Sequence, residues 1–138
     1  QHEYFYNIPL KNGVNELLDF LDIHCIPYGV ATVTYKNLAE AVLKRHGIYD
    51  RLKFLLTSAD FPQGKKSPDM YIRCAEIMGF APENVLIVED SLHCIETASS
   101  AGFLTAGIYD SLAENDRKNI IEISDYYFNK ISEIKGII

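Results

Sequence analysis

The sequence has few cysteines, and their arrangement excludes the usual disulfide and metal-binding patterns. Its three cysteines, Cys25, Cys74 and Cys94, are odd in number, widely spaced and without a C-x-x-C pair. All three lie in apolar or helical contexts. We therefore expect buried, reduced thiols in a cytoplasmic protein rather than a disulfide framework.

The chain also lacks an excess of positive charge and a long apolar run. It has 13 Lys and Arg residues against 19 Asp and Glu residues, which gives a net charge of -6. Without a basic patch we expect no nucleic-acid partner. No apolar run is long enough to span a bilayer and no signal-peptide pattern is visible, so we expect no membrane partner.

The most informative segment that is present runs from Val85 to Ser91, with the sequence VLIVEDS. Four apolar residues without a polar interruption predict a buried parallel strand, which ends at Glu89 and Asp90. Adjacent carboxylates at the carboxyl end of such a strand suit a hard cation such as Mg²⁺. The alternative is that Asp90 or Ser91 caps the following helix.

Periodicity along the rest of the chain predicts alternating helices and strands, and hence an α/β fold. Such alternation is typical of a doubly wound parallel sheet of the Rossmann type, with helices on both faces. With 138 residues the chain suits one domain. We expect helices over about 12–24, from 38 to 47, from 71 to 79, over 91–101 and over 112–121. Expected strands cover 28–34, 53–57, 85–89, 104–109 and 125–128, and a short helix lies near Ser132.

Two further polar positions are expected at the same edge of the sheet as Glu89 and Asp90. Thr32 ends a predicted strand, where a hydroxyl and the backbone N–H groups of the next turn can hold a phosphate oxygen. The alternative is a hydroxyl satisfied by the local backbone. Lys65 lies in a polar loop, where it can neutralise phosphoryl charge. The alternative is that Lys65 and Lys66 are both solvated.

Together these segments resemble the haloacid dehalogenase-like (HAD) hydrolases, and most closely their phosphatase and β-phosphoglucomutase branch. Lys65, Pro68-Asp69, Val85–Ser91 and Ala101-Gly102 match motifs three and four in order and spacing, and the strand ending at Thr32 resembles motif two. The resemblance implies hydrolysis of a small phosphorylated metabolite, a phosphomonoester, through an aspartyl-phosphate. A phosphomutase of the β-phosphoglucomutase type is the alternative.

The same resemblance assigns a role to each matching residue. Thr32 and the backbone of Val33 would bind the phosphoryl group. Lys65 would orient the nucleophile and the phosphate, so Thr32 and Lys65 are the implied catalytic residues. Glu89 and Asp90 would bind Mg²⁺, the expected cofactor. Lys66 stands where the family often has Pro.

One part of the family pattern is missing, because no D-x-D-x-T segment occurs anywhere in the sequence. In the family the first Asp of that segment is the nucleophile, and its strand lies at the centre of the sheet. We therefore expect residues 1–138 to be the C-terminal portion of a HAD-like core, with motifs two to four but without motif one and the cap domain. Alone, the chain would be inactive and would need a missing N-terminal segment or a strand-donating partner. A non-catalytic remnant that binds phosphate or a partner is the other alternative.

Overall fold

The computed structural model describes residues 13–138, and its elements follow the predicted order. The first residue of the predicted helix over 12–24 lies outside the described residues. The strands are β1 (Val30–Thr32), β2 (Leu55–Thr57), β3 (Leu86–Glu89), β4 (Leu104–Ile108) and β5 (Tyr126–Phe128). The α-helices are α2 (Val14–Ile23), α3 (Lys36–Arg45), α4 (Asp69–Met78), α5 (Leu92–Ser100) and α6 (Arg117–Ile123). The 3₁₀ helices are η1 (Tyr49–Arg51), η2 (Gly64–Lys66), η3 (Pro82–Asn84), η4 (Ser111–Asp116) and η5 (Ile131–Ile137).

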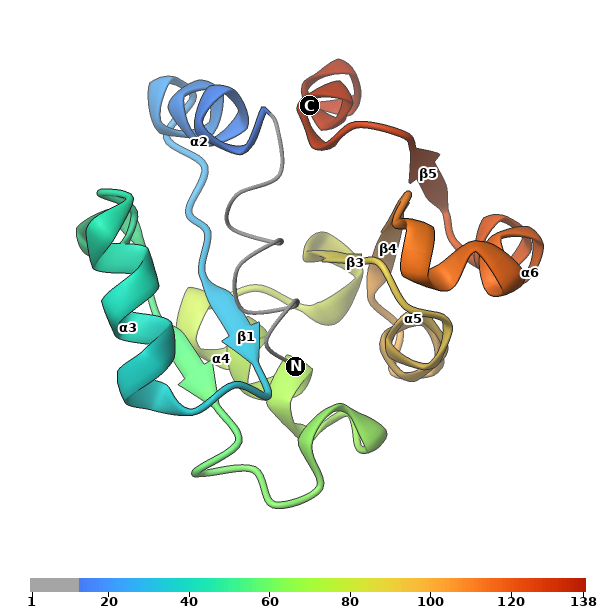
Figure 1. Cartoon of the computed structure of the whole chain (residues 1–138), viewed down its shortest axis with the longest axis horizontal. Coiled ribbons are helices and arrows are strands. Elements are labelled where there is room, and N and C mark those ends of the chain that lie inside the picture. Colours follow the sequence, from blue (N-terminus) through green and yellow to red (C-terminus); the bar gives the residue numbers. More distant parts are fainter. Residues whose placement is uncertain (1–12) are drawn as a thin grey trace.

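All strand pairs in the described residues are parallel, which confirms the predicted α/β class. β1 pairs with β2, and β3, β4 and β5 form a second sheet in that order. Figure 1 shows β1 and β2 with α3 in one half of the molecule, and β3 to β5 with α5 and α6 in the other. Among residues 13–138 no strand joins β1 to β3. The break falls where the family resemblance places the missing central strand.

One apolar cluster joins the two halves at the side chains. Leu17 and Leu18 of α2 pack in it together with Leu43 of α3, Ile108 of β4 and Ile134 of η5. Within α2 the buried residues Leu17, Leu18 and Leu21 recur at helical spacing, so one face of that helix is buried. The first and last described helices therefore hold the two sheets together.

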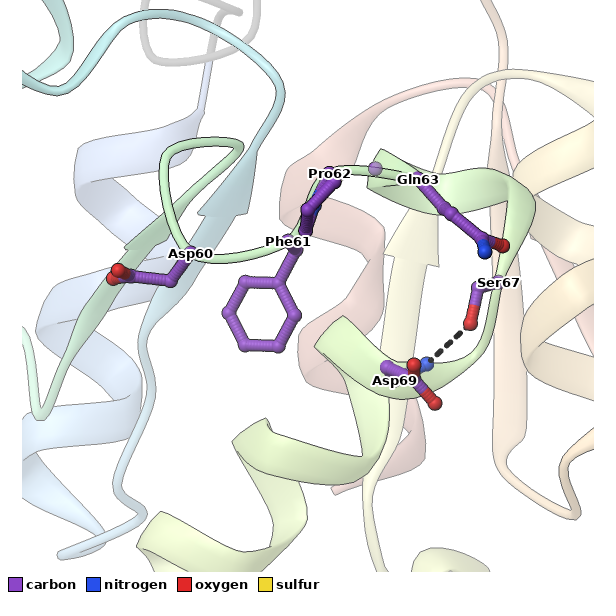
Figure 2. A pocket seen from close by; sticks show the side chains of 7 residues that line it. Asp60, Phe61, Pro62, Gln63, Ser67 and Asp69 are labelled. Atoms are coloured by element: carbon purple, nitrogen blue, oxygen red, sulfur yellow. Dashed lines mark hydrogen bonds between the residues drawn. The ribbon is translucent and has the colours of Figure 1, made fainter.

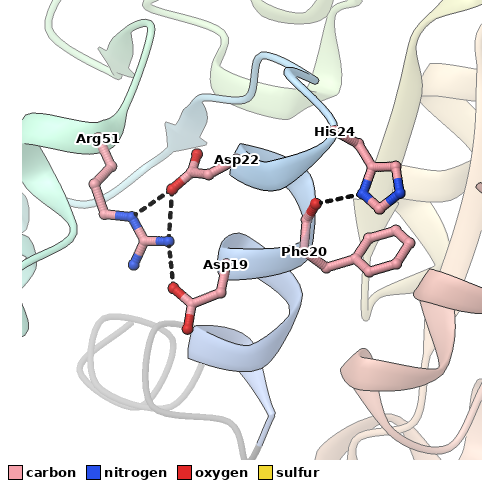
Figure 3. Close-up of polar contacts among 5 residues, drawn as sticks. All are labelled: Asp19, Phe20, Asp22, His24 and Arg51. Atoms are coloured by element: carbon pink, nitrogen blue, oxygen red, sulfur yellow. Dashed lines mark hydrogen bonds and ion pairs between the residues drawn. The ribbon is translucent and has the colours of Figure 1, made fainter.

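A charged clamp holds two exposed acids of α2, Asp19 and Asp22. Arg51 of η1 donates to Asp22 from Nε at 3.0 Å and from Nη2 at 2.7 Å, and its Nη2 also donates to Asp19 at 2.8 Å. Figure 3 shows the guanidinium lying between the two carboxylates. Its Arg51 partner lowers the pKa of Asp22. The end of α2 is thereby tied to the chain that leads into β2.

Two sequence-based expectations need correction. The helix predicted over 112–121 is broken, because the Asp110 side chain accepts from the Leu112 N–H at 2.8 Å and starts a separate 3₁₀ turn. Ala113 then leaves helical geometry. Cys25 is exposed rather than buried, since it lies in the turn after α2 with a positive φ of 56°. The other two cysteines are buried, and none of the three is in a disulfide.

No helix within residues 13–138 is both long and apolar enough to cross a membrane.

Candidate functional site

A buried ion pair joins the loop after β2 to the end of β3. Lys65 of η2 donates from Nζ to Oε2 of Glu89 at 2.5 Å, and their side chains are only 4% and 5% exposed. Lys66 next to it is exposed. The structure therefore separates the two lysines that the sequence left undistinguished, and it rules out a solvated Lys65. Each of these buried charges stabilises the other, because a buried charge without a partner has a large desolvation penalty.

Tyr71 of α4 is a third member of this cluster, and its role was not predicted from the sequence. Its hydroxyl donates to the same Oε2 of Glu89 at 2.8 Å, and the side chain is 1% exposed. Burial raises the pKa of Tyr71, and the nearby negative charge of Glu89 raises it further. The hydroxyl therefore keeps its proton and acts as a donor. The helical spacing of Tyr71 on the apolar face of α4 was the only sequence signal for its burial.

Two thiols line the same cluster. Burial raises the pKa of Cys74 to about 12 and also raises the pKa of Cys94, where the charge of Glu89 adds to the effect. Both thiols therefore stay protonated and are poor nucleophiles. Cys94 lies in α5 and interacts electrostatically with the Tyr71 hydroxyl. Its side chain therefore belongs to the cluster around Glu89.

Thr32 ends β1 and is 4% exposed. Its Oγ1 accepts a hydrogen bond from the Thr34 N–H at 3.1 Å, so the local backbone satisfies the oxygen as an acceptor. A hydroxyl has a proton and a second lone pair as well, so this bond leaves Thr32 able to donate to a phosphate. The carbonyl of Val33 accepts from Ser58 at 3.2 Å, which ties the loop after β1 to the loop after β2.

The acidic pair offers oxygen ligands of the kind that Mg²⁺ prefers. Among residues 13–138, Lys65 and Tyr71 both donate to Oε2 of the Glu89 side chain, and Asp90 beside it is half-buried. Ser91 occupies the N-cap position of α5 but makes no capping hydrogen bond through its side chain. Within residues 13–138 no group of three His, Cys, Asp or Glu side chains gathers around one point. With these two carboxylates alone, a hard cation such as Mg²⁺ would need its remaining ligands from water and phosphate.

A hollow of about 270 Å³ lies in the loop between β2 and α4, outside the Lys65–Glu89 cluster. Figure 2 shows Gln63, Ser67 and Asp69 at one end of it and Asp60 at the other, with the ring of Phe61 between them. The Asp69 N–H donates to the Ser67 hydroxyl at 3.3 Å, and Asp69 lies in the first turn of α4. The residues predicted to bind phosphate and metal do not line this hollow.

Comparison with known proteins identifies the family. A sequence model of the haloacid dehalogenase-like hydrolases matches residues 1–108. The chain is 30% identical over 127 residues to a phosphorylated carbohydrates phosphatase of Thermotoga maritima, covering 91% of this chain and 58% of the relative. It is 34% identical over 83 residues to a phosphoglycolate phosphatase of Neisseria meningitidis, covering 60% of this chain and 35% of that protein.

The fold is similar to solved structures of the same family. A candidate β-phosphoglucomutase from Thermotoga maritima matches with a TM-score of 0.80 and 30% identity, over 91% of this chain and 58% of that one. The chain thus spans a little more than half the length of this structure and of the carbohydrate phosphatase. The match over residues 1–108, the motif order and the parallel α/β fold show that this chain belongs to the haloacid dehalogenase-like hydrolase family.

Proposed function

We propose that this chain carries the phosphate- and metal-binding part of a Mg²⁺-dependent phosphatase that acts on a small phosphorylated metabolite. The observation that carries the proposal is the buried Lys65–Glu89 pair next to Asp90. A lysine held against the carboxylate that ends β3 suits a reaction that moves a phosphoryl group, because such catalysis depends on positioning and charge neutralisation. The names of the two curated relatives support a phosphomonoester as substrate.

Each predicted site residue has a role in this proposal. The Thr32 hydroxyl and the Val33 N–H bind oxygens of the phosphoryl group. Lys65 neutralises charge on the phosphoryl group and on the attacking carboxylate. Asp90 holds Mg²⁺ directly, and Glu89 holds it directly or through water. When bound, the ion draws negative charge from the phosphoryl oxygens.

The nucleophile has to come from a segment that these 138 residues do not contain. An Asp on that segment would attack phosphorus, the P–O bond to the alcohol would break, and water would then hydrolyse the aspartyl-phosphate. We propose that the segment forms a strand between β1 and β3, supplied either by the same protein or by a partner through β-augmentation. In this proposal residues 1–138 form the later part of the core domain, and the cap domain lies outside them.

A phosphomutase is the second candidate, and the likeness to a candidate β-phosphoglucomutase favours keeping it. Both reactions share the aspartyl-phosphate step, and they differ in whether water or a second sugar hydroxyl accepts the phosphoryl group. Release of inorganic phosphate from a sugar phosphate indicates a phosphatase. Conversion of one sugar phosphate into its isomer without release indicates a mutase.

The first experiment compares Asp90→Asn with the unaltered protein, in the form that its natural gene encodes. Hydrolysis of p-nitrophenyl phosphate is measured with and without Mg²⁺. We expect turnover that requires Mg²⁺ and that falls at least about 100-fold in Asp90→Asn, because the metal loses a charged ligand. Asp50→Asn is the matched control, since Asp50 is an exposed acid in η1. A protein without any turnover would instead support a non-catalytic remnant.

A second experiment measures turnover by the purified 138-residue chain. We expect none above background, because the nucleophilic Asp is absent. Robust turnover would show that another residue of this chain is the nucleophile. The coding sequence before the Gln1 codon provides a simpler check, since an apolar strand ending in D-x-D-x-T there would supply the missing group.

A further inference from the structure

The carboxylate of Glu89 receives two donors on one oxygen. Lys65 Nζ donates to Oε2 at 2.5 Å and the Tyr71 hydroxyl donates to the same atom at 2.8 Å. In the described structure neither hydrogen bond ends on Oε1. A carboxylate held through one oxygen has a defined plane, and its second oxygen stays available to another ligand.

The donors come from two different elements, so they fix Glu89 from two directions. Lys65 belongs to η2, and Tyr71 lies in the first part of α4. The ring of Tyr71 packs edge-on against Phe103, with ring centroids 6.2 Å apart, and belongs to the apolar cluster that includes Ala75. The hydroxyl is therefore placed by core packing, and it gains little freedom to follow a moving carboxylate.

We propose that Tyr71 is a positioning residue for Glu89. Its hydroxyl, with Lys65, occupies Oε2 and thereby turns Oε1 toward the metal that the proposed function places beside Asp90. This inference rests on the proposed function for the identity of the ligand, but the orientation of Glu89 is inferred from its contacts with Lys65 and Tyr71. Hydrogen-bond partners of metal-ligating side chains commonly matter in this way, because they fix ligand geometry.

Tyr71→Phe is the decisive variant, because it removes one hydroxyl and keeps the ring that packs on Phe103. Tyr49→Phe is the matched control. The Tyr49 hydroxyl donates to a carboxylate oxygen of Glu40 at 3.4 Å, outside the Lys65–Glu89 cluster. Binding of Mn²⁺, a spectroscopic probe for Mg²⁺, is measured by electron paramagnetic resonance. We expect Tyr71→Phe to weaken it by about 10-fold to 100-fold and Tyr49→Phe to leave it unchanged.

A metal-free measurement separates this inference from the proposed function. In protein labelled with ¹³C at the Glu carboxyl carbon, the Glu89 signal is identified by its loss in Glu89→Gln. We expect that signal to move in Tyr71→Phe and to stay in place in Tyr49→Phe. A Glu89 signal unmoved by Tyr71→Phe, in a variant whose circular dichroism shows the native fold, would overturn the inference.

Mn²⁺ binding and the ¹³C signal of Glu89 together show whether the metal-dependent function or the positioning role of Tyr71 has failed. If the unaltered protein binds no Mn²⁺ but the Glu89 signal moves in Tyr71→Phe, the positioning of Glu89 stands and the metal-dependent function fails. If Mn²⁺ binds equally well to the unaltered protein and to folded Tyr71→Phe, the metal-dependent function stands and the positioning role fails. Loss of Mn²⁺ affinity in both Tyr71→Phe and Tyr49→Phe would also overturn the inference, because the effect would not be specific to Glu89.

Discussion

At the scale of single residues, burying Lys65 and Glu89 costs free energy because both charges lose their water. Their mutual attraction offsets this cost only when both side chains are present. Both side chains are almost fully removed from water, so each depends on its partner for solvation. Breaking such a pair on one side leaves an uncompensated charge. Replacing both members by neutral groups avoids that penalty. The pair is therefore well suited to function, and its net contribution to stability is small.

This argument predicts the effect of Lys65→Met on folding. We expect a loss of about 3–5 kcal/mol in the free energy of unfolding, because the buried Glu89 side chain loses its cationic partner. The double variant Lys65→Met/Glu89→Gln should recover most of that loss. Lys66→Met, at an exposed position, should change it by less than about 0.5 kcal/mol. Urea denaturation measures all three variants, and equal effects of the two single Lys substitutions would contradict the argument.

The sequence was enough to select Lys65 and Glu89 as site residues, but it did not predict the contacts that they make. Glu89 could be singled out because a charged residue after an apolar strand is unusual, and Lys65 because it matches the spacing of the family motifs. Lys65 could not be told from Lys66, since only the 3₁₀ turn of η2 decides which of the two points inward. Tyr71 was hidden among the apolar residues of its helix. Nothing in its spacing shows that the hydroxyl reaches a carboxylate 18 residues away.

At the scale of elements, β4 packs so closely against its neighbours that a small residue is required at one position. A Cβ on Gly107 would lie 2.6 Å from Ile120 Cγ2 and 2.9 Å from Tyr127 Cδ1. We expect Gly107→Ala to lower the free energy of unfolding by about 1–3 kcal/mol through overpacking. Gly136→Ala is the control, since a Cβ there meets nothing within 4 Å. Thermal unfolding of both variants checks this, and a neutral Gly107→Ala would refute it.

The clamp between α2 and η1 predicts a pH dependence. Arg51 lowers the pKa of Asp22 below the usual value of 3.8, so the folded protein holds the ionised form more firmly than the unfolded chain does. The stabilisation is present above the unfolded pKa and is lost as the pH falls through the lower, folded pKa. In Arg51→Met, stability should therefore fall less between pH 5 and pH 3 than in the unaltered chain. Urea midpoints across this range measure the difference, and parallel curves would contradict it.

Element boundaries show where sequence patterns stop being informative. Residues 12–24 and 91–101 were predicted as helices from apolar periodicity, and α2 and α5 lie within those ranges. The helix predicted over 112–121 was wrong in its first part, because a single Asp side chain competes with the helix for the backbone of the next turn. Such local competition depends on the orientation of one side chain, which hydrophobic spacing does not record.

At the scale of the whole molecule, two separate sheets share one apolar cluster. Because α2 and η5 pack across both halves, we expect the halves to unfold together. Leu18→Ala should cost about 2–5 kcal/mol and should lower the hydrogen-exchange protection of β2 and β4 to the same extent. A loss of protection confined to one sheet would show that the halves unfold independently. The sequence predicted the gap between the sheets from a missing motif, but it gave no sign of this bridging cluster.

Because one thiol is exposed and two are buried, the rate of thiol labelling can report local opening of the core. A maleimide dye at neutral pH should attach quickly to Cys25 and very slowly to Cys74 and Cys94, which are buried and protonated. The first label is thus specific without mutagenesis. The rates of the slow reactions at Cys74 and Cys94 would report how often the core next to Glu89 opens. A ligand that stabilises the closed form of this site would lower those rates.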